Sequence, residues 1–155
     1  MKNKILVFVI LPFLFLMLSC TNKKGATIGD YLLFYQAGGF AGGSQQPYYL
    51  LSSGKLQADT SAGLRQSSMS VNNLNFNYQL PAAKYNMVSN LLASIPAEML
   101  NNNNKDFGTS PGMDMGGIVV KASLNGQSYT WTFEPDQSAS SPAVVQFITE
   151  IRLLF

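Results

Sequence analysis

The sequence predicts an α+β fold in which an antiparallel sheet of about four to five strands is packed by two helices. Short aromatic and branched segments separated by turn residues predict the strands. Two segments with apolar residues at helical spacing predict the helices, one after the third strand region and one at the C-terminus. A 46% hydrophobic and 12% aromatic composition can fill one core, so we expect residues 31–155 to form a single domain.

The first two strands are predicted on either side of a glycine-rich segment. Tyr31 to Ala37 and Pro47 to Leu51 are rich in aromatic and branched residues. Ser53-Gly54 then signals a turn, and Lys55 to Ser68 has no clear pattern. The glycine-rich segment between the two strands consists of Gly38, Gly39, Phe40, Ala41, Gly42 and Gly43. It is either a wide hairpin loop or a contact site with Phe40 projecting.

A third strand and the first helix are predicted next. Apolar residues alternate with polar ones from Asn73 to Leu80, which is the period of a half-buried strand. Pro81 suits the first position of a helix. The buried stripe of that helix would be Val88, Leu91, Leu92 and Ile95. The Asn-rich segment from Asn101 to Gly117 is expected to be a long loop.

A hairpin and a second helix complete the domain. Ile118 to Leu124 and Gln127 to Glu134 flank Asn125-Gly126, a pair that tolerates positive φ at both turn positions. That turn sets Ile118, Val120 and Ala122 opposite Phe133, Trp131 and Tyr129, with Lys121 opposite Thr130. Ser141 would cap a helix beginning at Pro142, with Val144, Phe147, Ile148, Ile151 and Leu154 as its apolar stripe.

The N-terminus has the pattern of an export signal, residues 1–19. Lys2 and Lys4 precede an apolar run of about fourteen residues, shorter than the roughly 20 that span a bilayer. Residues 16–20, Leu-Met-Leu-Ser-Cys, resemble the bacterial lipobox, which implies that Cys20 is lipidated and becomes the first mature residue. The alternative is an ordinary signal with an incidental cysteine. By resemblance to enteric lipoproteins, Thr21 implies the outer membrane, and residues 20–30 would be a flexible tether.

Composition argues against several functions. Without Lys2 and Lys4, eight basic residues balance eight acidic ones, which does not favour nucleic-acid binding. The chain has no histidine and its one cysteine is assigned to lipid, so we expect no enzyme, no metal site and no cofactor. The glycine-rich segment contains no lysine and does not lead into a helix, unlike a phosphate loop.

Other candidate side chains are interpreted structurally. The acids Asp106, Asp114, Glu134 and Asp136 lie where solvated loop residues are common. Trp131 is expected in the core rather than in a sugar site. Tyr48 and Tyr49 must point to opposite faces, so one of them is expected to be exposed.

The order of elements resembles the emfourins, small protein inhibitors of thermolysin-like metalloproteases. The likeness is carried by a strand ending in residues 38–42, a second strand closing at Ser53-Gly54, a helix, a strand pair and a proline-led final helix. It implies inhibition of a protease through Gly38 to Gly43, with Phe40 foremost. The alternative is a lipoprotein that binds another envelope protein or a glycan.

Overall fold

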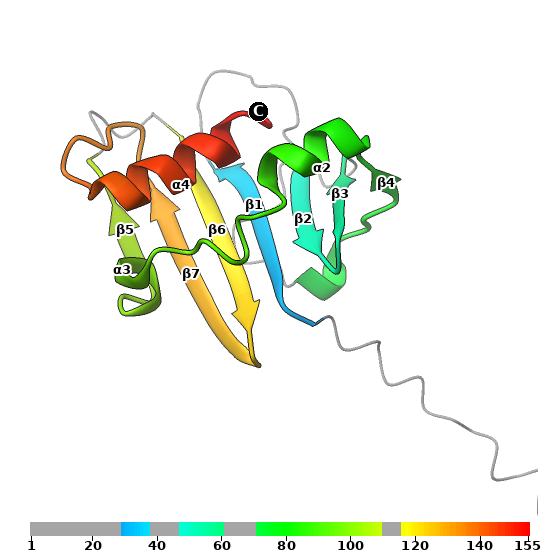
Figure 1. Ribbon diagram of the computed structural model, residues 1–155, viewed down its shortest axis with the longest axis horizontal. Coiled ribbons are helices and arrows are strands. Elements are labelled where there is room, and N and C mark those ends of the chain that lie inside the picture. The colour runs from blue at the N-terminus through cyan, green and yellow to red at the C-terminus, as the bar shows by residue number, and fades with distance from the viewer. Residues whose placement is uncertain (1–28, 38–46, 61–70, 110–115) are drawn as a thin grey trace, which may run out of the picture.

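The computed structural model describes residues 29–37, 47–60, 71–109 and 116–155, whose strands form one mixed sheet (Figure 1). Within this part of the chain the sheet has seven strands in the order β4-β3-β2-β1-β6-β7-β5. The strands are β1 (Tyr31–Ala37), β2 (Tyr48–Ser52), β3 (Lys55–Asp59), β4 (Tyr78–Gln79), β5 (Lys105–Phe107), β6 (Gly117–Leu124) and β7 (Gln127–Phe133). The α+β class is confirmed, but the predicted antiparallel sheet of about four to five strands is wrong, because β5 runs parallel to β7.

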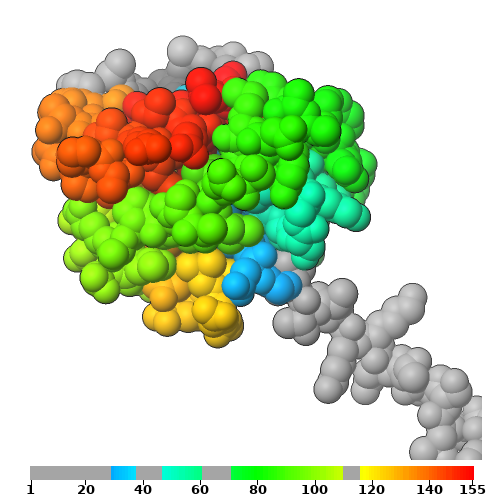
Figure 2. All heavy atoms as spheres, viewed as in Figure 1, coloured from blue at the N-terminus to red at the C-terminus, as the bar shows by residue number. Residues whose placement is uncertain are grey.

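The α-helices of the described residues lie on one face of the sheet. They are α2 (Ala82–Val88), α3 (Ala97–Leu100) and α4 (Pro142–Arg152), and a short 3-10 turn, η1, spans Val71–Asn73. In Figure 1, α4 crosses over β7 and β6, while α2 lies beside β2 and β3. Figure 2 shows α2, α4 and the connection between α2 and β5 together covering this face, with the end of the β6–β7 hairpin projecting beyond them. No helix in the described ranges is long and apolar enough to cross a bilayer.

The sheet is buried on both faces at its centre. On the helix face, Trp131, Phe133 and Phe34 are fully buried in the main core. A second cluster on the opposite face contains Leu33, Tyr35, Tyr48, Leu50 and Val119. The central strand β1 therefore contributes alternate residues to two cores, and side chains pack on both faces of its middle part.

The predicted β6–β7 hairpin is confirmed in its turn and its register. Asn125 has φ 51° and Gly126 has φ 80°, as a type I′ turn requires. Ile118 lies opposite Phe133, Val120 opposite Trp131, and Lys121 opposite Thr130. Trp131 is fully buried, so its predicted core role is confirmed. Its indole Nε1 donates to the carbonyl oxygens of Met99 and Asn102, at 2.9 and 3.2 Å.

The predicted strand from Asn73 to Leu80 is only partly correct. Only Tyr78–Gln79 joins the sheet, as the edge strand β4. Leu74 and Phe76 pack on the second cluster, whereas Leu80 packs on the main core. The segment thus passes around the sheet edge from one face to the other, and Tyr78 between them is 54% exposed. Apolar and polar residues alternate here because the segment passes from one core to the other, not because it forms one half-buried strand.

Strand β3 was not predicted because its apolar content is small. Leu56 and Ala58 are its buried residues on the main core, and they alternate with Gln57 and Asp59. The Ser53-Gly54 turn joins β2 to β3, with φ 47° and 74°. Both tyrosines of β2 are buried, Tyr48 in the second cluster and Tyr49 in the main core. Their opposite orientations are therefore confirmed, but the expectation that one is exposed is wrong.

The first predicted helix is shorter than its apolar stripe suggested. Helix α2 ends at Val88, and turns follow in which Leu91 N–H donates to the Val88 carbonyl oxygen at 3.0 Å. Ser89 and Asn90 are weak helix formers. The chain then crosses the sheet to α3 on the β7 side (Figure 1). Val88 and Leu91 are nevertheless fully buried, and Leu92 and Ile95 pack against the same core.

The segment expected to be a long loop contains β5. Asn104 N–H donates to the Thr130 carbonyl oxygen at 2.9 Å, which starts the parallel pairing with β7. Asn103 extends this pairing with its side chain, because its Oδ1 accepts from Thr130 N–H at 2.9 Å and its Nδ2 donates to the Ser128 carbonyl oxygen at 3.0 Å. The asparagines therefore serve as strand partners for β7.

The C-terminal helix follows its prediction. Ser141 caps α4 by accepting from Val144 N–H at 3.5 Å, and Pro142 occupies the first turn. The buried residues are Val144, Phe147, Ile148 and Ile151, with Leu154 buried just beyond the helix. Helix α4 thereby closes the main core over β6 and β7.

Candidate functional site

The predicted contact segment, Gly38 to Gly43, and the predicted lipid site, Cys20, lie outside the described residues. The strands that flank the glycine-rich segment fix where it leaves and rejoins the sheet. β1 ends at Ala37, β2 begins at Tyr48, and these neighbouring strands are antiparallel. Ala37 also lies opposite Gly117, the first residue of β6. We call this side of the sheet, where β1 ends, the Ala37 end.

The strand that leads into the glycine-rich segment is held firmly. The four residues from Leu32 to Tyr35 are at most 3% exposed. β1 pairs with β6 along its whole length and with β2 along its first four residues. Tyr35 and Tyr48 stack with ring centroids 4.5 Å apart, and Phe34 and Tyr49 stack at 5.7 Å on the other face. Both flanks of the segment therefore start from ordered, close-packed backbone.

A cleft of about 270 Å³ opens at the Ala37 end. Its lining residues come from β1, β6, β7, α4 and the ends of these elements: Gln36, Gly116, Gly117, Ile118, Phe133, Pro135, Arg152 and Phe155. The lining includes Phe133, which is fully buried, and Phe155, which is 41% exposed. Arg152 Nη2 donates to the carbonyl oxygens of Glu134 and Pro135, at 3.2 Å each. An apolar lining beside a guanidinium suits an apolar or acidic side chain.

A hydrogen-bonded turn supports the rim of this cleft. Thr109 and Asp136 form a β-bridge beyond β5 and β7. The buried amide of Gln137 donates to the Phe107 carbonyl oxygen at 3.0 Å. Hydrogen bonds from Ser138 and from the Thr109 hydroxyl hold the pKa of the Asp136 carboxyl below its usual range. Gly108 has φ 88° and passes so close to this turn that a Cβ would meet the Asp136 carbonyl oxygen.

The tip of the β6–β7 hairpin, Asn125-Gly126, lies at the opposite end of the sheet. Asn125 N–H donates to Asp30 Oδ1 at 2.7 Å, which places the tip beside the start of β1 (Figure 2). The seven residues of β1 separate this end from the Ala37 end, and a strand of that length spans roughly 20 Å. The tip and the strand ends at Ala37 therefore belong to two separate surfaces.

The predicted solvated acids fall in turns and at strand ends. Asp106 is exposed in β5, Glu134 is half-buried after β7, and Asp136 is exposed in its turn, whereas Asp114 lies outside the described residues. Within the described ranges, no three acids, cysteines or histidines gather closely enough to hold a metal ion. Sequence reasoning did not identify Arg152 and Phe155 as cleft residues. The one signal in the sequence concerned Arg152, which is a basic residue in the last turn of α4.

Comparisons with known proteins add no family assignment. No protein-family model matches the chain, and no curated protein matches it.

Proposed function

We propose that the protein is an exported, non-catalytic lipoprotein of the outer membrane, anchored through Cys20, which binds another protein through the Ala37 end of its sheet. In its specific form the proposal is an emfourin-like inhibitor that occupies the cleft of a thermolysin-like metalloprotease. The glycine-rich segment, Gly38 to Gly43, would make the contact with Phe40 foremost. No nucleic acid, metal or cofactor enters this function.

The observation that carries the proposal is the burial of β1 on both faces from Leu32 to Tyr35, shortly before the strand ends at Ala37. A contact segment held by rigid strands loses less conformational entropy on binding than one on a mobile support. Glycine lets backbone approach a partner closely. The ordered strand end therefore supports a role for residues 38–43 in binding, because it fixes the two points from which they depart.

The direction of β1 supports an orientation relative to the membrane. The proposed tether, residues 20–30, enters β1 at Tyr31, and β1 then runs to Ala37. A tether of these eleven residues reaches at most about 40 Å when fully extended. A lipid on Cys20 would hold the Tyr31 end of the sheet toward the bilayer and leave the Ala37 end pointing away from it. A partner in the envelope could then reach the proposed contact surface.

Inhibition would work by occlusion. Segments at the Ala37 end would cover the protease cleft without presenting a peptide bond in a geometry that can be cleaved. The cleft beside Arg152 would lie against the rim of the target. The protein would remain intact in the complex, which separates an inhibitor from a substrate.

The test is inhibition of thermolysin-like proteases by a purified soluble form beginning at Thr27, titrated around equimolar ratio. Intact mass would be followed to detect cleavage. We expect stoichiometric inhibition with the protein intact, at least tenfold weaker after Phe40→Ala. Tyr78→Ala is the matched control, because Tyr78 is an exposed aromatic on β4 at the far edge of the sheet. Equal inhibition by wild type and Phe40→Ala would remove the assignment to the glycine-rich segment.

The second candidate is an adaptor that binds a different envelope protein or a glycan at the same end. The observation that favours it is the cleft itself, which combines Arg152 with the partly exposed ring of Phe155. No inhibition across several such proteases would favour this candidate over the inhibitor.

A further inference from the structure

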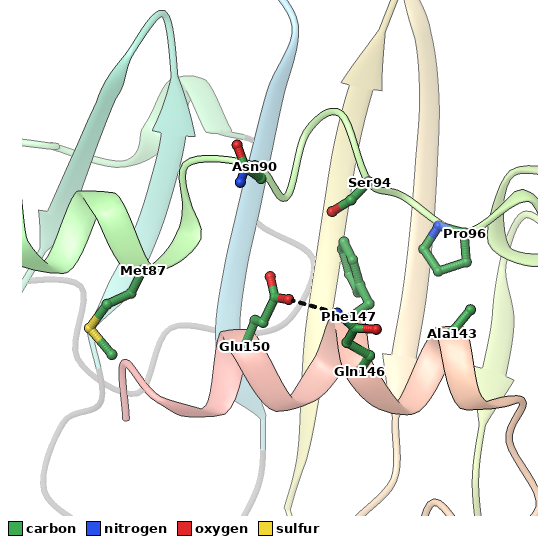
Figure 3. Close-up of a pocket in the computed structure, with 8 residues that line it drawn as sticks. All are labelled: Met87, Asn90, Ser94, Pro96, Ala143, Gln146, Phe147 and Glu150. Carbon is green, nitrogen blue, oxygen red and sulfur yellow. Dashed lines mark hydrogen bonds between the residues drawn. The ribbon is translucent and has the colours of Figure 1, made fainter.

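A second hollow runs along α4 on the helix face of the molecule, and we call it the α4 groove (Figure 3). Its volume is about 470 Å³. One wall is α4, and the other is the chain from the end of α2 to the start of α3. Its lining residues are Met87, Asn90, Ser94, Pro96, Ala143, Gln146, Phe147 and Glu150.

The length of the groove follows from the spacing of its residues on α4. Ala143, Gln146 and Glu150 recur at i, i+3 and i+7, so they lie along one side of the helix. From Ala143 to Glu150 a helix rises about 10 Å. An extended polypeptide advances about 3.3 Å per residue, so the groove matches about three residues of a strand-like segment.

The base and rim of the groove are apolar. The Phe147 ring points from α4 toward the facing chain (Figure 3) and is only 3% exposed. Pro96 is also buried. Met87 stands at one end and is 40% exposed. A methionine at a rim adapts its shape to different apolar side chains.

The polar groups of the groove include one charge. Glu150 extends from α4 toward the facing chain, and Gln146 Nε2 donates to its Oε1 at 3.4 Å (Figure 3). Within the described residues no cation lies within ion-pair distance of Glu150, since the one pair found there joins Lys105 to Glu98 at 3.3 Å. Lys84, on the neighbouring helix α2, donates its Nζ to the Leu153 carbonyl oxygen instead, at 3.3 Å. The groove therefore presents a carboxylate to solvent that the described side chains leave uncompensated.

We propose that the α4 groove binds a short extended segment of another polypeptide that carries a lysine or arginine beside an apolar residue. The cation would meet the Glu150 carboxylate, and the apolar side chain would pack mainly against the exposed Met87, above the nearly buried Phe147 ring. The side chains of Asn90, Ser94 and Gln146 supply donors and acceptors for the backbone of the bound segment. A glycan is a poorer match, because the Phe147 ring is too buried to offer a flat stacking surface. This site lies on the helix face and does not rest on the function proposed for the Ala37 end.

The experiment is an NMR titration of the ¹⁵N-labelled purified protein with three capped tripeptides that differ only at the centre: Leu-Lys-Leu, Leu-Gln-Leu and Leu-Glu-Leu. We expect millimolar binding of the lysine peptide, with amide shifts concentrated at residues 87–96 and 143–150. Binding of the glutamine peptide should be about two- to fivefold weaker, which corresponds to the free energy of a partly exposed ion pair. Binding of the glutamate peptide should be weaker still. Glu150→Gln should remove the difference between the lysine and glutamine peptides. Glu134→Gln, which alters a carboxylate outside the groove, should keep it.

A blocking variant tests the location independently of charge. Ala143→Phe should fill one end of the groove and abolish the shifts from all three peptides. Thr149→Phe is its control, since Thr149 is an exposed position on α4 that does not line the groove. Amide spectra of each variant would verify that the fold is retained.

Three outcomes would overturn the proposal. One is equal binding of the three peptides to wild type, which would exclude recognition of charge. Another is a set of shifts that avoids the groove or survives Ala143→Phe. The third is the absence of shifts with every peptide at about 10 mM, because a contact of this size should bind at about millimolar concentration.

Discussion

Replacing Gly108 by alanine should destabilise the protein far more than the same change at Gly126. Both residues have positive φ, 88° and 80°, so each alanine bears the strain of the left-handed region, about 1 to 2 kcal/mol. At Gly126 an added Cβ meets nothing within 4 Å. At Gly108 it would clash with the Asp136 carbonyl oxygen and with Gln137 Nε2.

The additional cost at Gly108 comes from the turn that must move. Relief of the contact separates Thr109 from Asp136, which exchange two backbone hydrogen bonds of 2.7 and 3.3 Å, and each is worth about 1 kcal/mol. It also displaces the buried Gln137 amide from the Phe107 carbonyl oxygen, at about 1 to 3 kcal/mol. The total for Gly108→Ala is about 4 to 7 kcal/mol, against about 1 to 2 kcal/mol for Gly126→Ala.

Urea unfolding measures both values through Trp131, the one tryptophan of the chain, which is fully buried. The two variants should have similar denaturant slopes and very different midpoints. If their free energies of unfolding agree within about 0.5 kcal/mol, the steric argument at Gly108 is refuted, because strain of φ alone would explain both.

Two other predictions concern hydrogen bonding and ionisation. Asn103→Ala should cost about 0.5 to 1.5 kcal/mol, because the Thr130 amide loses its acceptor at an exposed position, and hydrogen exchange at Thr130 should accelerate; unchanged exchange would contradict this role. Burial, with a smaller contribution from Tyr48, raises the pKa of Tyr35 to about 12, whereas a tyrosine in the unfolded chain titrates near about 10. The stabilisation by neutral Tyr35 should therefore be complete below pH of about 10 and lost as pH rises toward about 12, which absorbance at 295 nm and urea unfolding would follow. Tyr35→Phe should flatten that decline, and an identical decline in the variant would exclude Tyr35 as its source.

The parts of the fold that could be predicted are those whose determinants are local. The β6–β7 hairpin rests on Asn125-Gly126 and on two apolar rows that agree in one register only. Helix α4 rests on the Ser141 cap and an apolar stripe within eleven residues. In both cases the residues that specify the element lie within the element.

The missed parts depend on partners distant in sequence. β5 forms because Asn103 and Asn104 meet β7, which follows more than twenty residues later, and four consecutive asparagines give no local sign of a strand. Leu74 and Leu80 look alike in the sequence, yet they pack in different cores. Only the path of the chain around the sheet edge distinguishes them.

The candidate sites were least predictable because both are composite. The cleft at the Ala37 end brings Gln36 together with Arg152, and no spacing rule relates them. The α4 groove left a partial signal, since Ala143, Gln146 and Glu150 form one side of an amphipathic helix. The facing wall was hidden because the sequence suggested that the first helix continued through Ser89 and Asn90.

The bond between Asp30 and Asn125 has a mechanical consequence. Any pull on the N-terminal segment enters the domain at the start of β1, where Asp30 links that strand to the β6–β7 turn at 2.7 Å. A force directed along β1 loads its antiparallel bonds to β2 and β6 in shear, so that many must rupture together. The same force applied at β4, an edge strand of two residues, would open pairs one after another. The N-terminal segment thus joins the domain through a strand whose bonds are loaded together and resist extraction.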